Sequence, residues 1–115
     1  MVEHKTGYID IASQDFPEQV LQAEQMVLVD FSSDKSNACQ IFDAEFAAVG
    51  KEYQSRVTFT RLNIDNETSL TNEWNVTGIP TVIFFKNGQE INRINGIIMR
   101  QKLRKQIEGT LLAHF

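Results

Sequence analysis

The single cysteine of this chain, Cys39, stands where thiol chemistry is possible. An apolar run at residues 26–31 is followed by a short polar loop, and Cys39 comes at the start of the amphipathic segment after it. Strand, loop and thiol at a helix start form an arrangement that favours the thiolate, because a helix N-terminus stabilises negative charge. A protein with one cysteine cannot close an internal disulfide, so the pattern does not by itself define a complete reaction.

Two polar residues flank this thiol in the sequence. Asp30 interrupts the apolar run, and a buried carboxylate without a partner costs free energy, so it needs a reason. Ser36 precedes Cys39 by three residues, the spacing at which a serine caps a helix N-terminus. A hydrolase nucleophile at Ser36 is discounted, because its hydroxyl stays protonated at neutral pH and no general base lies near it in the sequence.

The composition limits the class of protein. With 115 residues and 42% hydrophobic content, residues 1–115 are expected to form a single domain with a real core. The net charge of −4 gives no electrostatic case for nucleic acid or an anionic membrane as the main partner. Basic residues are concentrated near the C-terminal end of the sequence, on a predicted helix, and we interpret them as its solvated face.

Localisation and cofactors are inferred from what the sequence lacks. It has no apolar stretch that could span a membrane and no signal-peptide pattern at its start, and with one thiol this predicts a reducing, cytoplasmic setting. No cluster of Cys, His and acidic residues has metal-ligand spacing, so neither a metal nor another cofactor is expected. We expect the chain to be a monomer.

The elements that must position these residues follow from hydrophobic periodicity. Strands are predicted at about 8–11, 26–31, 57–64, 81–85 and 90–95, with helices at about 16–23, from 38 onward, around 70–74 and at 99–112. Alternating strands and helices require parallel pairing, whereas the Asn87-Gly88 turn adds an antiparallel edge. The predicted fold class is α/β, with a mixed central sheet of four to five strands flanked by four helices.

Two helical stripes carry much of the predicted core. Their members recur at steps of three and four, which places them on one helix face. The first stripe is Cys39, Phe42, Phe46, Val49 and Tyr53, and the second is Met99, Leu103, Ile107 and Leu111.

Several motifs, taken in order, resemble the thioredoxin family from about Phe16 to the C-terminus. They are Val-Leu-Val-Asp-Phe at 27–31, Leu-Asn-Ile-Asp at 62–65, Gly-Ile-Pro-Thr at 78–81, Phe-Phe-Lys-Asn-Gly at 84–88, and Gly96. The spacing between them fits without insertion or deletion. The resemblance implies the thioredoxin fold and a thiol-disulfide oxidoreductase lineage.

The resemblance also implies roles for single residues. Where the family carries Trp-Cys-Gly-Pro-Cys, this chain has Lys-Ser-Asn-Ala-Cys at 35–39. Ser36 therefore replaces the attacking cysteine, Cys39 matches the resolving cysteine, and Asp30 matches the acid that relays a proton to it. Pro80 matches the cis-proline, beside which the backbone near Ile79 pairs with an extended peptide. We include Gly96, which follows the hairpin, in this substrate-binding groove.

Three functions remain open on this sequence. The first is a redox protein of the thioredoxin lineage that cannot complete dithiol turnover. The second is a non-redox module that binds peptides or proteins, favoured by the loss of the family's loop tryptophan and prolines. The third is a monothiol protein that forms mixed disulfides through Cys39, unless this thiol is merely a buried hydrophobe. Expected partners are protein substrates or peptides beside Pro80, with glutathione or a thioredoxin reductase as further possibilities.

Overall fold

The computed structural model describes residues 7–66 and 68–114. Its strands are β1 (Ile9–Ile11), β2 (Met26–Ser32), β3 (Val57–Asn63), β4 (Thr81–Lys86) and β5 (Gln89–Asn95). Its helices are α1 (Asn37–Tyr53), α2 (Thr68–Glu73) and α3 (Arg100–Ala113), with short turns η1 (Ser13–Asp15), η2 (Pro17–Leu21) and η3 (Ile64–Asn66).

The strands form one mixed sheet in the order β1-β3-β2-β4-β5. β1 and β2 pair with β3 in parallel, whereas β4 runs antiparallel to both β2 and β5. The α/β fold with a mixed sheet, predicted from the sequence, is confirmed. The Asn87-Gly88 turn joins β4 to β5 with positive φ at both residues, as a tight hairpin of this kind needs.

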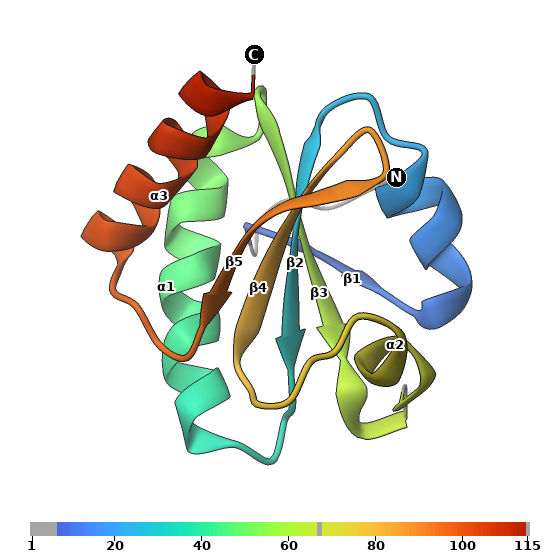
Figure 1. Cartoon of the computed structure of the whole chain (residues 1–115). Coiled ribbons are helices and arrows are strands. Elements are labelled where there is room, and N and C mark those ends of the chain that lie inside the picture. Colours follow the sequence, from blue (N-terminus) through green and yellow to red (C-terminus); the bar gives the residue numbers. More distant parts are fainter. Residues whose placement is uncertain (1–6, 67, 115) are drawn as a thin grey trace.

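Helices cover both faces of the sheet (Figure 1). α1 and α3 lie side by side over one face, and η2 and α2 lie over the other. β2 is buried along its whole length because its side chains alternate between these two layers. Leu28 packs in the core under α1 and α3, and Val29 packs in the core on the opposite face.

The apolar stripe of α1 is confirmed. All five of its predicted members, from Cys39 to Tyr53, are buried, four of them with no exposed surface at all. The second stripe is confirmed at Leu103 and Ile107 but is wrong at Met99, which is 55% exposed. Met99 has extended backbone angles and is the N-cap of α3, so its side chain precedes the first turn and does not reach the core.

The segment predicted as a helix at 16–23 contains instead one short turn, η2. η2 is a π-helical turn, closed by a hydrogen bond of 3.0 Å from the Gln22 N–H to the Pro17 carbonyl. Proline lacks an N–H group and fits the first turn, but five residues are too few to propagate a regular helix. Three α-helices thus stand in the described residues, where the sequence predicted four helices.

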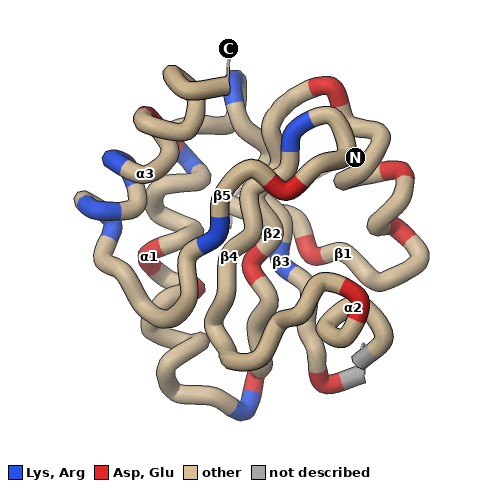
Figure 2. Tube along the Cα trace, in the orientation of Figure 1, with Lys and Arg blue, Asp and Glu red and all other residues tan. Residues whose placement is uncertain are grey.

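Two arginines of α3 pair with acidic residues of α1, and Figure 2 shows where basic and acidic residues lie along the two helices. Arg100 binds Glu45 and Arg104 binds Glu52, with closest N–O distances of 3.0 and 2.6 Å in the two ion pairs. These contacts lie at the surface, so each contributes little to stability but holds the two helices in register. In the described residues, no helix is long and apolar enough to cross a bilayer.

A close backbone approach ties the start of the described chain to α1. A Cβ atom built on Gly50 would lie 1.9 Å from the carbonyl oxygen of Gly7 and 3.1 Å from the ring of Phe59. Both neighbours are packed, so only glycine fits at this point of the helix.

We expect the substitution Gly50→Ala to destabilise the protein by about 1–3 kcal/mol, because the added methyl group overpacks this contact. Gly109→Ala is the matched control, since a Cβ there meets no atom within 4 Å. That variant should gain about 0.5–1 kcal/mol from helix propensity. Urea denaturation measures both, and equal stability of Gly50→Ala and wild type would contradict the close approach.

Candidate functional site

Ser36 caps α1, as its position in the sequence predicts. Its Oγ accepts a hydrogen bond of 3.1 Å from the Cys39 N–H. The loop before it is also held by hydrogen bonds, from the Ser36 N–H to the Ser33 carbonyl at 3.3 Å and from the Ser33 hydroxyl to Asp65 at 2.7 Å. The hydroxyl of Ser36 therefore lies at the helix end, where the resemblance places an attacking thiol.

Cys39 lies in the first turn of α1 with its side chain directed toward the sheet. None of its surface is exposed. The thiol is free, but it is enclosed by the packing of α1 on β2. A reagent in solution cannot reach the sulfur of Cys39 in this conformation.

Asp30 is fully buried in β2, on the face that α1 covers. No N–H or hydroxyl group of the described residues donates a hydrogen bond to either of its carboxyl oxygens, and the group within hydrogen-bonding reach is the carboxyl of Asp43. Burial raises the pKa of Asp30 well above its ordinary value, and the neighbouring Asp43 carboxylate raises it further. Cys39 acts in the same direction, whereas the positive charge of Arg61 opposes the shift. Asp30 therefore keeps its proton at a pH where an exposed aspartate has lost it.

A network around Asp43 and Arg61 was not predicted from the sequence. Arg61 is 8% exposed, and it donates to Asp43 at 2.9 Å and to Asp34 at 2.7 Å. The Ser32 hydroxyl also donates to Asp43, at 2.9 Å. Arg61 is the cross-strand neighbour of Asp30, yet its hydrogen bonds go to the other two carboxylates. The buried acid is left without a direct cationic partner.

Two signals in the sequence could have revealed this network. Asp43 follows the cysteine by four residues, which places both on one helix face. Arg61 interrupts a predicted strand that is otherwise apolar or uncharged. A buried arginine requires carboxylate partners, and Asp43 is one of them in the structure.

The Ile79–Pro80 peptide bond is cis. Thr81 pairs with Phe31 of β2, so Pro80 lies beside the end of β2 from which the Ser36 loop departs. The Gly96 N–H donates to the Pro80 carbonyl at 2.8 Å, with Gly96 in a positive-φ conformation. The structure thus brings Ile79, Pro80 and Gly96 to the same end of the sheet as Ser36, Cys39 and Asp30.

Three exposed apolar side chains come from the first half of α1 and from the segment between β5 and α3. Ile41, Ile97 and Met99 are exposed by 53%, 40% and 55%, and they are three of the four large apolar residues exposed in the described part of the chain. The Arg100 N–H donates to Glu45 at 2.8 Å, which holds the start of α3 against the first half of α1. We call Ile41, Ile97 and Met99 the apolar rim.

The described residues contain no group of three or more His, Cys, Asp or Glu side chains that could hold a metal ion. The polar side chains at this end of the sheet include those of Ser36, Asp30 and Asp43, with the thiol of Cys39 among them. A buried strand, a capped helix and a cis-proline loop at one end of a mixed sheet are the arrangement of a thioredoxin-like protein.

Comparison with known proteins identifies the family. The thioredoxin family model matches residues 7–109, so this chain belongs to the thioredoxin family. Probable thioredoxin-2 of Caenorhabditis elegans is 31% identical over 111 residues, which cover 96% of this chain and 77% of that protein. Thioredoxin of Rickettsia bellii is 26% identical over 89% of this chain and 97% of its own length.

A third relative is considerably longer than this chain. Chloroplastic thioredoxin M-type of Spinacia oleracea is 31% identical over 102 residues. The match covers 89% of this chain but only 56% of the spinach protein. These relatives place the chain in a lineage of thiol-disulfide oxidoreductases.

The burial of Cys39 predicts its reactivity. We expect the native protein to keep an unmodified intact mass after incubation with oxidised glutathione, because the sulfur is closed to solvent. In guanidinium chloride the same treatment should add one glutathione, and the Cys39→Ala variant is the control that adds none. Rapid glutathionylation of the folded protein would show instead that Cys39 is accessible.

The burial of Asp30 predicts a dependence of stability on pH. Its folded-state pKa is raised above the unfolded value near 3.8, so the folded state binds more protons and loses stability as pH rises through the folded pKa. Asp30→Ala removes this loss. We expect the variant to be more stable than wild type at pH 8 by about 1 kcal/mol or more, with the gain fading toward pH 4.

The exposed carboxylate of Asp10, on β1, offers the matched control. Asp10→Ala should show no comparable gain in urea denaturation across the same pH range. A constant difference between Asp30→Ala and wild type from pH 4 to pH 8 would contradict the burial of an uncompensated acid.

Proposed function

We propose that this chain binds extended segments of partner proteins in the groove beside Pro80 but does not complete dithiol exchange. The proposal joins the thioredoxin lineage to a site that has lost its attacking thiol. The observation that carries it is the N-cap hydrogen bond of Ser36, where the family carries the attacking cysteine, above a fully buried Cys39.

The chemistry supports this reading. In a two-thiol protein, one thiolate attacks a substrate disulfide, forms a mixed disulfide and releases one substrate thiolate. The second thiolate then attacks that mixed disulfide, releases the other substrate thiol and leaves a disulfide within the protein. Ser36 cannot perform the first step because its hydroxyl stays protonated, and no sulfur then receives the attack of Cys39.

Binding of a peptide without disulfide exchange does not require the attacking thiol that this chain lacks. The backbone near Ile79 can pair with an extended peptide, and the apolar rim can cover its side chains. The partners we propose are protein or peptide segments. Glutathione and a thioredoxin reductase are weaker candidates, because Cys39 is enclosed and a chain with one cysteine offers a reductase no internal disulfide to reduce. We place this function in a reducing compartment such as the cytoplasm.

Ser36→Cys tests the lineage. The substitution returns a second thiol to the helix N-terminus, and we expect reduction of insulin disulfides, with dithiothreitol as electron source, to rise about tenfold or more above wild type. The rate of insulin precipitation measures it. The control is the double variant Ser36→Cys/Cys39→Ala, which, in a single-turnover assay without dithiothreitol, should form a mixed disulfide with insulin and then stop.

The outcomes separate the interpretations. Turnover by Ser36→Cys alone supports a redox scaffold that lacks only its attacking thiol. If Ser36→Cys folds, as circular dichroism can verify, and still reduces insulin no faster than wild type, the redox lineage no longer explains the site. Efficient insulin reduction by the wild-type chain would overturn the proposal itself.

A further inference from the structure

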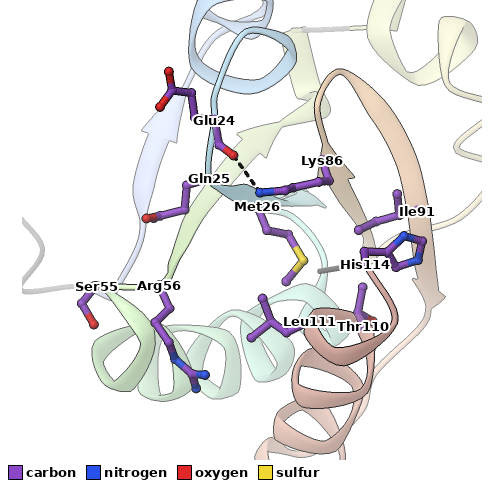
Figure 3. Close-up of a pocket in the computed structure, with 10 residues that line it drawn as sticks. All are labelled: Glu24, Gln25, Met26, Ser55, Arg56, Lys86, Ile91, Thr110, Leu111 and His114. Carbon is purple, nitrogen blue, oxygen red and sulfur yellow. Dashed lines mark hydrogen bonds between the residues drawn. The ribbon is translucent and has the colours of Figure 1, made fainter.

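A cavity of about 380 Å³ lies at the opposite end of the sheet from Ser36 and Pro80 (Figure 3). It is formed by the start of β2, the end of β4, the chain after α1 and the last turn of α3. Small-molecule sites in proteins measure about 300–1,000 Å³, so this cavity has the size of a binding site. Neither the groove beside Pro80 nor Cys39 contributes to it.

The lining of the cavity is more apolar than polar, although Gln25, Ser55, Thr110 and His114 also contribute to it. Met26 forms part of its wall, and Ile91 of β5 and Leu111 of α3 complete the apolar lining. Met26 is 3% exposed and belongs to the core, so this wall is fixed by the packing of the sheet. An apolar body placed here would lose water from its surface without disturbing the core.

The charge at the mouth of the cavity is positive. Lys86 donates to the main-chain carbonyl of Glu24 at 2.8 Å, which uses one of the three N–H donors of its ammonium group. No carboxylate of the described residues lies within ion-pair distance of Lys86. The carboxylate of Glu24 points away from the cavity in Figure 3. Arg56 also lines the site, but it is already paired with Glu108 at 2.7 Å.

We propose that this cavity binds a small, free organic anion with an apolar body, whose anionic group contacts Lys86. The body rests on Met26, Ile91 and Leu111, and the anion takes the unused donors of the ammonium group. The last carbonyl groups of α1 and α3 carry partial negative charge, so the anionic group belongs at Lys86 on the β4 side and the apolar body toward α3. The proposal is independent of the function proposed for the Pro80 groove.

Naphthalene-2-carboxylate and its neutral analogue 2-naphthalenemethanol are suitable probes, because they share an apolar body and differ in charge. We expect the anion to shift the amide resonances of Met26, Lys86 and Leu111 in a titration of the ¹⁵N-labelled chain. The neutral probe should bind about fivefold more weakly, the contribution of one partly exposed charge contact.

Substitutions of Lys86 test whether the anionic group of the probe contacts its ammonium group. Lys86→Met should weaken binding of the anion about fivefold and leave the neutral probe unchanged, whereas Lys86→Arg should retain the preference. Lys102→Met is the matched control, because it removes the same charge from an exposed position of α3 that does not line the cavity. Amide dispersion of each variant verifies its fold.

Three results would overturn the proposal. They are equal affinity for the charged and neutral probes, loss of binding in Lys102→Met to the same extent as in Lys86→Met, and resonance shifts confined to the apolar rim. The last result would place the probe in the Pro80 groove, and it would leave the test by Ser36→Cys unaffected.

Discussion

Burial of β2 on both faces is the constraint on which the rest of the structure depends. The strand pairs with β3 on one side and β4 on the other, so every residue of it is fixed by neighbours in the sheet and by a layer above and below. The loop that leads to α1 begins where β2 ends. Strand β4, which pairs with β2, begins directly after Pro80. The relative position of the cap, the thiol and the proline loop therefore follows from one strand.

That same burial explains the unusual state of Asp30. A carboxyl group at this position must either find a cation or remain protonated. Arg61 could serve as its cation, but Asp43 and Asp34 take its hydrogen bonds. Burial, and then the neighbouring Asp43, thus favour the neutral form of Asp30.

Local patterns predicted most of the fold. The stripe of α1 and the alternation of strands and helices are properties of neighbouring residues, and periodicity reports them directly. The Asp43–Arg61 network and the cavity at Lys86 were not predicted, because their members come from elements far apart in the sequence. Met99 was misplaced because a step of four does not reveal where a helix begins. Ser36 was interpreted correctly, since an N-cap is a local contact.

The apolar rim of Ile41, Ile97 and Met99 also affects how copies of the protein meet in solution. When two copies meet through this face, these apolar side chains lose contact with water, which favours association. The net charge of −4 opposes such collisions over about one Debye length, which is about 10 Å at 0.1 M salt. Added salt screens that repulsion and leaves the apolar attraction in place, so the colloidal stability of concentrated samples declines as ionic strength rises.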